Sequence, residues 1–237
     1  MCYHTSNKHP QAKKMEEEFR RQTRFPELYT PFYHMNGYDH EVIQGLSQNE
    51  DEIVPMRWGI VPPGTLNIQA YWKEFGGKCL NTKSEYVFDN IRTSDAILHN
   101  RVVIPVTGFF EPHDRGDISF PYFIKPVETE YLGMLGCAVR YDEMYLFTIL
   151  TTVANDFVGK IHNIEEPRMP IMVSPDKADD WLDPTLERLD IRDIINDHVT
   201  PKLEAWPVMK SVTNSHVKTN VPQALERYDY PVQGTLF

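Results

Sequence analysis

The sequence contains few cysteines, little glycine and no long apolar run, and each shortage excludes a class of protein. Three cysteines in 237 residues cannot form a disulfide scaffold, and their spacing contains no CxxC pair for zinc or dithiol chemistry. Twelve glycines and 18 prolines are too few for a collagen-like or low-complexity chain. No stretch approaches the roughly 18 consecutive apolar residues of a membrane span, and no secretory signal opens the sequence. We therefore expect a soluble, cytoplasmic protein without membrane partners.

Positive charge is also scarce. The chain has 34 acidic and 24 basic residues, for a net charge of −10. This excess argues against a surface covered in phosphate contacts, because such contacts need lysine and arginine. The acidic residues concentrate in residues 175–197, whereas basic residues collect in residues 8–24 and 202–218. A modest basic groove on an acidic molecule is compatible with this distribution.

The hydrophobic pattern predicts one mixed domain over residues 1–237. Its fold class is α+β, with a mostly antiparallel, barrel-like β core flanked by helices. A loop is expected over residues 25–38. The expected helices are 13–24, 84–98, 153–160 and two acidic helices within 175–197. The expected strands are 51–62, 101–110, 118–125, 131–140, 144–152, 170–174 and a piece within 203–212.

Cys2 has a chemistry that no internal cysteine shares. An initiator methionine is normally removed before a small second residue, and removal of Met1 leaves Cys2 with a free α-amine beside its thiol. These groups ordinarily have pKa values of about 7.7–8.0 and about 8.5. Such an aminothiol converts an aldehyde into an imine and then into a five-membered thiazolidine. The alternative is a frayed terminus without function. Cys79 and Cys137 lie in apolar segments and are expected to be buried thiols.

Two polar segments follow apolar runs. Asn81 offers an amide that can orient an amine or a sugar oxygen, and Lys83 offers a point charge for a phosphate. An ordinary loop that caps a helix is the alternative for this segment. Glu111 ends an apolar strand between phenylalanines and a proline, where desolvation would raise its pKa and suit it to proton transfer. A solvent-facing glutamate at a strand end is the alternative there.

A third segment contains His162 and Arg168. Histidine is the side chain whose ordinary pKa lies nearest neutral pH. Arginine can bind a carboxylate or phosphate through two parallel hydrogen bonds. A purely structural role is the alternative for each residue.

The order of these segments resembles the SRAP (SOS response-associated peptidase) family. The resemblance rests on Met-Cys at positions 1–2, Asn-x-basic-x-Glu at 81–85, Pro-x-x-Gly-Phe-Phe-Glu at 105–111, and Ile-His at 161–162 followed by Arg-Met-Pro at 168–170. It extends from Cys2 to about Leu182 and more weakly to residue 215. It implies a protein of the DNA damage response that binds abasic sites in single-stranded DNA. It also implies a covalent thiazolidine crosslink through Cys2 after Met1 removal, and a possible self-cleaving peptidase step.

The resemblance also implies roles for individual residues. Cys2 is the nucleophile, Asn81 positions it and the sugar, and Glu111 shuttles protons. His162 assists at the sugar hydroxyl. Lys83, Arg168, Trp58 and Trp72 are then the expected DNA contacts. We expect no metal and no cofactor, and a monomer.

The chain departs from the family pattern at several positions. Lys83 stands where the family usually has arginine, and Pro112 follows Glu111 where tryptophan is frequent. The segment that begins at Trp58 lacks the next aromatic residue of the family, for which Trp72 is a replacement. Two other functions remain alternatives. One is an amidohydrolase with an N-terminal cysteine nucleophile, and the other is a noncatalytic module that binds single-stranded nucleic acid.

Overall fold

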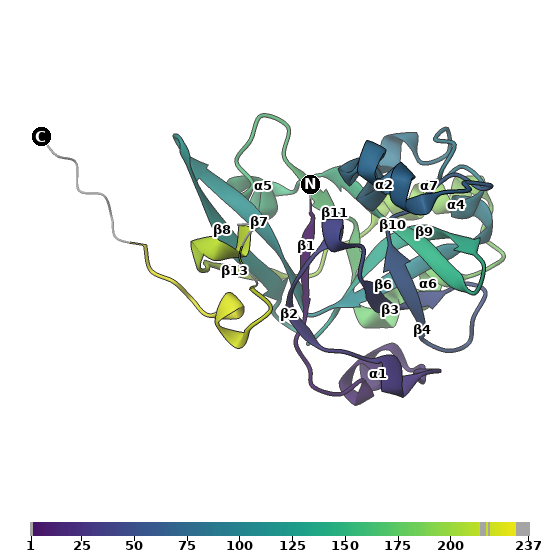
Figure 1. Ribbon diagram of the computed structural model, residues 1–237, viewed down its shortest axis with the longest axis horizontal. Coiled ribbons are helices and arrows are strands. Elements are labelled where there is room, and N and C mark those ends of the chain that lie inside the picture. Colours follow the sequence, from purple (N-terminus) through teal and green to yellow (C-terminus); the bar gives the residue numbers. More distant parts are fainter. Residues whose placement is uncertain (1, 214–216, 218, 231–237) are drawn as a thin grey trace, which may run out of the picture.

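A computed structural model describes residues 2–213, 217 and 219–230 and shows a mixed α+β fold (Figure 1). A five-stranded sheet lies on one side of the molecule, and each of its neighbouring strands pairs in antiparallel fashion. Its order is β13 (Leu203–Pro207), β8 (Ile118–Pro126), β7 (Gly108–Arg115), β1 (His4–Asn7) and β2 (Phe32–Asn36).

The second sheet closes on itself as a barrel, because its fifth strand pairs again with its first. The ring consists of β9 (Leu132–Tyr141), β10 (Met144–Val153), β4 (Val54–Trp58), β3 (Val42–Ser47) and β6 (Arg101–Val106). Only the β10–β4 pair of this ring is parallel. Three short strands pair with this ring. β5 (Asn81–Lys83) and β11 (Arg168–Pro170) pair with β10, and β12 (Met172–Val173) pairs with β9. The mostly antiparallel, barrel-like core is therefore confirmed.

Short helices surround the strands. In Figure 1, α2, α4 and α7 gather at the barrel, whereas α5 lies near β7 and β8. The helices are α1 (Lys13–Phe19), α2 (Ile68–Phe75), α3 (Gly77–Leu80), α4 (Ala96–His99), α5 (Asp156–Ile161), α6 (Ala178–Leu182) and α7 (Arg188–Asp197). The 3-10 turns are η1 (Pro26–Leu28), η2 (Gly37–Asp39), η3 (Ser84–Tyr86), η4 (Pro175–Lys177), η5 (Lys210–Thr213) and η6 (Pro222–Leu225).

Across the described ranges, none of these helices has both the length and the apolar character needed to span a bilayer.

The alternation of side chains along β7 explains why a glutamate is buried. Phe109 joins the main core with Ile124, whereas Phe110 packs on the other face with Phe123 and Val208. Because successive side chains of a strand point to opposite faces, Glu111 returns to the face of Phe109. The strand thus directs a carboxyl group into the apolar interior.

Several predicted elements have different bounds. The helix predicted over 84–98 is wrong, since only η3 and α4 form there and turns separate them. The predicted loop 25–38 contains η1 and β2. The predicted strand 101–110 is two strands, because the chain leaves the barrel at Thr107 and its N–H binds the Ser6 carbonyl oxygen. Helix α1 ends at Phe19 because Arg20 adopts φ 56°. The acidic helices are confirmed as α6 and α7, and Cys79 and Cys137 are buried as predicted.

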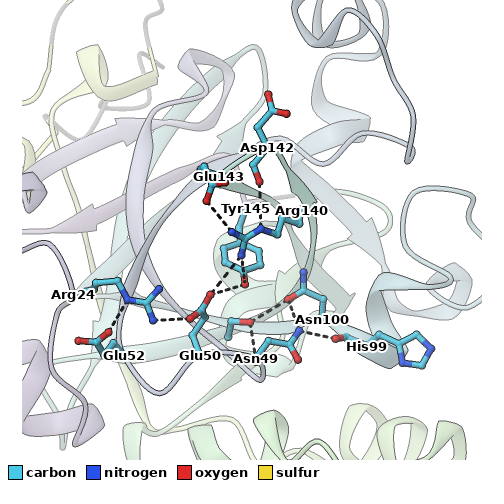
Figure 2. Close-up of polar contacts among 11 residues, drawn as sticks. Arg24, Asn49, Glu50, Glu52, His99, Asn100, Arg140, Asp142, Glu143 and Tyr145 are labelled. Atoms are coloured by element: carbon cyan, nitrogen blue, oxygen red, sulfur yellow. Dashed lines mark hydrogen bonds and ion pairs between the residues drawn. The ribbon is translucent and has the colours of Figure 1, made fainter.

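A polar network ties the β3–β4 connection to the β9–β10 hairpin (Figure 2). Arg24 contacts Glu50 and Glu52, each at 2.6 Å. The Tyr145 hydroxyl donates to Glu50 at 2.8 Å and accepts a 3.3 Å hydrogen bond from Arg140. None of these residues belongs to the predicted site, so we assign the network to the stability of the barrel.

Candidate active site

Cys2 lies in the interior, where Asn81 holds it. Its side chain is fully buried, and its Sγ–H donates to the His4 carbonyl oxygen at 3.6 Å. The Asn81 Nδ2 donates to the Cys2 carbonyl oxygen at 2.7 Å. Asn81 reaches this position because β5 pairs with β10 in parallel and places Asn81 opposite Ile149. The structure therefore places the Asn81 amide in contact with Cys2, as the predicted positioning role requires.

Glu111 and His162 form a second buried pair. Their side chains are 1% and 5% exposed, and His162 Nδ1 lies 3.4 Å from Glu111 Oε2. Burial raises the pKa of Glu111 to about 7 and lowers the pKa of His162. A carboxyl group with this pKa exists in both protonation states near neutral pH, as proton transfer in both directions requires.

The backbone fixes which imidazole nitrogen is available. His162 Nδ1 also lies 3.2 Å from the Arg168 carbonyl oxygen. A carbonyl oxygen only accepts hydrogen bonds, so Nδ1 carries the proton. In neutral His162 the lone pair then resides on Nε2, which is the nitrogen able to accept a proton.

The pKa of the Cys2 thiol depends on its burial and on the charge of Glu111. Burial raises the pKa of the Cys2 thiol well above its ordinary value, and the nearby charge of Glu111 adds to the rise. The thiol is therefore protonated at neutral pH, and the thiolate is the reactive form of a cysteine. A reaction at Cys2 consequently needs a neighbouring group that accepts the thiol proton.

Asn81 retains an acceptor beside Cys2. Its Oδ1 atom is buried and has no hydrogen-bond partner within the part of the chain that the structure describes. Leaving a buried acceptor unsatisfied is unfavourable by about 1–3 kcal/mol. A ligand hydroxyl or amine that donates to Oδ1 would recover this energy.

Comparison with known proteins identifies the family of this chain. The family model described as SOS response associated peptidase (SRAP) matches residues 1–215. The chain belongs to the SRAP family. Membership associates the protein with DNA damage and with abasic sites. The comparison with curated proteins finds no match.

Solved structures share the SRAP fold of this chain. A protein from Bacteroides thetaiotaomicron is 23% identical, with a TM-score of 0.83 over 96% of this chain and 100% of that one. A protein from Bordetella bronchiseptica is 21% identical, with a TM-score of 0.70 over 88% and 100% of the two chains. A phage-related protein from the same organism is 19% identical, with a TM-score of 0.63 over 88% and 95%.

The two tryptophans predicted to contact DNA in this SRAP protein are core residues. Trp58 is fully buried, and its Nε1 donates to the Leu80 carbonyl oxygen at 2.8 Å. Trp72 is 5% exposed and stacks on His40 at a centroid distance of 3.9 Å. Neither indole presents a face to a nucleobase, so the DNA contacts predicted for Trp58 and Trp72 do not agree with the structure. The sequence pattern gives no measure of burial for a lone tryptophan.

Arg168 is occupied by protein groups. It is 7% exposed and binds Glu85 through two parallel hydrogen bonds of 2.9 and 2.7 Å. It also donates to the Thr151 carbonyl oxygen at 2.6 Å. The structure thus shows an internal ion pair where a DNA contact was predicted. This pairing was not predicted, although the opposite charges in the motifs at 81–85 and 168–170 were a sequence signal for it.

The position of Lys83 is compatible with its predicted contact to DNA, unlike that of Arg168. Its side chain is partly exposed and forms no ion pair or side-chain hydrogen bond with the residues that the structure describes. A lysine without an internal partner remains available for a phosphate.

Proposed function

We propose that this SRAP protein captures abasic sites in single-stranded DNA as a covalent thiazolidine on Cys2, after Met1 has been removed. The observation that carries the proposal is the convergence of Cys2 with Asn81, Glu111 and His162. These residues come from widely separated parts of the chain, and together they supply a nucleophile, a positioning amide and two groups for proton transfer.

The reaction needs no oxidant, reductant or cofactor. An abasic deoxyribose opens to expose an aldehyde, and the Cys2 α-amine attacks its carbon to give a carbinolamine. Loss of one water produces an imine. The Cys2 sulfur then adds to the imine carbon while its proton passes to the nitrogen, which closes the thiazolidine. The net reaction joins protein and DNA with the release of one water molecule.

Glu111 serves the steps that need a proton in each direction. Its protonated form donates to the departing hydroxyl of the carbinolamine, and its ionised form accepts the proton of the buried thiol. A pKa of about 7 allows both steps at neutral pH.

His162 and Asn81 act on the sugar and the amine. The Nε2 atom of His162 accepts the proton of the sugar hydroxyl when the closed hemiacetal ring opens. The unsatisfied Oδ1 of Asn81 accepts a hydrogen bond from the attacking amine, while its Nδ2 holds the Cys2 carbonyl oxygen. Both roles place the aldehyde carbon beside the Cys2 nitrogen.

The proposed consequence is protection of the damaged strand, since the crosslinked sugar no longer presents the aldehyde that promotes strand cleavage. Removal of Met1 is a single peptide hydrolysis, performed by this same cluster or by a cellular aminopeptidase. We assign no peptidase action on other proteins.

A denaturing gel tests the proposal. The protein is incubated with a single-stranded oligonucleotide that contains one abasic site, and with a matched oligonucleotide that contains a tetrahydrofuran analogue, which has no aldehyde. No borohydride is added, so only an adduct that is stable without reduction is seen. We expect a slow-migrating adduct of the unmodified protein with the abasic oligonucleotide alone, and no adduct of Cys2→Ala with either oligonucleotide. Glutamine hydrolysis that depends on Cys2, without any adduct, would instead establish the amidohydrolase alternative.

A further inference from the structure

Two attachments join β7 to the segment that carries His162. In the first, His113 Nδ1 lies 3.0 Å from the Ile161 carbonyl oxygen, and because a carbonyl only accepts, Nδ1 is the donor. Ile161 ends α5, and the carbonyl groups of the last helical turn lack partners within the helix. The His113 ring packs edge-on against Tyr122 of β8 at a centroid distance of 5.6 Å. Strand β7 thus supplies a hydrogen bond to the residue directly before His162.

The second attachment is a reciprocal pair of hydrogen bonds on the other side of His162. The Asp114 backbone N–H donates to Asn163 Oδ1 at 2.7 Å, and Asn163 Nδ2 donates to the Asp114 carbonyl oxygen at 2.8 Å. An amide side chain can form both bonds because it has a donor and an acceptor. Asn163 follows His162 directly, so the histidine is attached to β7 through both of its neighbours.

These attachments align His162 with Glu111. Glu111 and His113 lie two positions apart on β7 and share one face of the strand, and α5 lies near this strand (Figure 1). The distance of 3.4 Å between His162 Nδ1 and Glu111 Oε2 is longer than the roughly 2.7–2.9 Å of a charge-assisted hydrogen bond. The direct contact is therefore too long to hold the imidazole at the carboxyl group without the attachments beside it.

We propose that His113 and Asn163, which we name the β7 clamp, are positioning residues that hold His162 at Glu111 while the aldehyde is captured. The inference rests on the proposed function, because it assigns the clamp to that reaction. The clamp touches no reacting atom and acts through His162. A displacement of about 1 Å can reduce a catalysed rate by about 100-fold. The clamp begins directly after Pro112, where the chain departs from the family pattern.

The clamp also keeps water from Glu111, because it holds a buried imidazole against the carboxyl group. Burial is the main cause of the raised Glu111 pKa. Among the described residues, the titratable groups that interact with Glu111 are His162, Cys2 and Tyr3, and Asp114 acts on His162. Release of His162 would admit water, so the Glu111 pKa would fall toward its ordinary value of about 4.3.

The rate of adduct formation and the noncovalent affinity together test the clamp. Protein in excess over the abasic oligonucleotide gives the rate at saturation, and fluorescence anisotropy with the tetrahydrofuran oligonucleotide gives the dissociation constant. Asn163→Ala and His113→Phe should each lower the rate about tenfold and change the dissociation constant less than about twofold. His113→Phe keeps a ring against Tyr122 but has no donor. His113→Asn keeps a donor near the position of Nδ1 and should retain most of the rate.

Asn155→Ala is the matched control at the other end of α5. Asn155 Oδ1 accepts a hydrogen bond from the Val158 N–H at 2.9 Å and caps the helix, so its loss loosens α5 without touching the clamp. The rate at saturation should stay close to that of the unmodified protein. An equal loss of rate in Asn155→Ala would assign the effect to general loosening of the helix and would overturn the inference.

The pKa of Glu111 gives a readout that needs no DNA and that a purely structural role would not move. It is measured from the pH dependence of the ¹³C chemical shift of the carboxyl group. It should be about 7 in the unmodified protein and in Asn155→Ala, and lower in Asn163→Ala and His113→Phe. An unchanged pKa or an unchanged rate in both clamp variants would overturn the inference. A lowered pKa in these variants, with no adduct from the unmodified protein, would support the clamp and contradict the proposed function.

Discussion

His162 Nδ1 lies between two acceptors, 3.2 Å from the Arg168 carbonyl oxygen and 3.4 Å from Glu111 Oε2. This relationship fixes the imidazole tautomer and couples it to a carboxyl group whose pKa burial raises to about 7. The backbone of Arg168 is held by the pairing of β11 with β10, and its guanidinium binds Glu85 and Thr151. Strand pairing thus places the carbonyl oxygen that orients His162.

The first prediction concerns proton transfer by Glu111. Glu111→Gln keeps the shape of the side chain but cannot exchange a proton, so adduct formation should slow by about 10²–10⁴-fold, the usual contribution of general acid–base catalysis. The rate of adduct formation by the unmodified protein should change with an apparent pKa near 7, and this transition should be absent in Glu111→Gln. A rate that follows the same pH profile in both proteins would assign the proton transfer to another group.

The raised pKa of Glu111 also predicts how the free energy of unfolding depends on pH. Its folded pKa of about 7 exceeds the ordinary value of about 4.3, so the folded state binds this proton more tightly than the unfolded state. The associated stability is present below about pH 4.3 and is lost as the pH rises through 7. Glu111→Gln should therefore raise the free energy of unfolding relative to the unmodified protein at pH 8, by at most about 4 kcal/mol.

Urea unfolding at pH 5 and pH 8 measures this difference for both proteins. The difference between the two proteins should be smaller at pH 5, where Glu111 is mostly protonated in the folded state. A variant that is destabilised equally at the two pH values would contradict the predicted proton linkage.

The second site prediction concerns Asn81. Asn81→Ala removes the donor to the Cys2 carbonyl oxygen and the acceptor beside it. Adduct formation should slow by about fivefold to 150-fold, which corresponds to about 1–3 kcal/mol for a lost buried hydrogen bond. Thr82→Ala, on the neighbouring buried position of β5, is the control for a general disturbance of the strand. A similar loss of rate in Thr82→Ala would assign the effect to β5 packing.

The sequence predicts Cys2, Asn81, Glu111 and His162 as site residues because each has a chemistry that depends on residue type and motif order, and the structure brings Asn81 to Cys2 and His162 to Glu111. The sequence predicted the long strands β8, β9 and β10 for a similar reason, since their apolar runs are continuous. It missed β1 and β5, whose few residues are ordered by tertiary pairing. It misjudged Trp58 and Arg168, because burial and partner choice are set by residues distant in the sequence.

The internal role of Arg168 leads to a prediction that separates stability from DNA binding. Glu85→Gln removes one partner of a mostly buried guanidinium and should destabilise the fold by about 1–2 kcal/mol, a reduced value because the Glu85 side chain is 46% exposed. The melting temperature should fall, while the affinity for the tetrahydrofuran oligonucleotide should change by less than about twofold. A large gain in DNA affinity would mean that Glu85 competes with a phosphate for Arg168.

Salt dependence tests how many phosphates the protein neutralises. If Lys83 contacts one phosphate, the logarithm of the binding constant for single-stranded DNA should fall with the logarithm of salt concentration less steeply in Lys83→Ala, by about 0.7 in slope. An unchanged slope in Lys83→Ala would show that Lys83 contacts no phosphate.

The central claim is that the aminothiol of Cys2 bonds to the aldehyde of an abasic site, and intact mass spectrometry of the reaction tests it most directly. The account predicts an adduct whose mass equals the protein without Met1 plus the oligonucleotide minus one water, stable to denaturation without reduction. An adduct that still contains Met1, or the same stable adduct from Cys2→Ala, would contradict it.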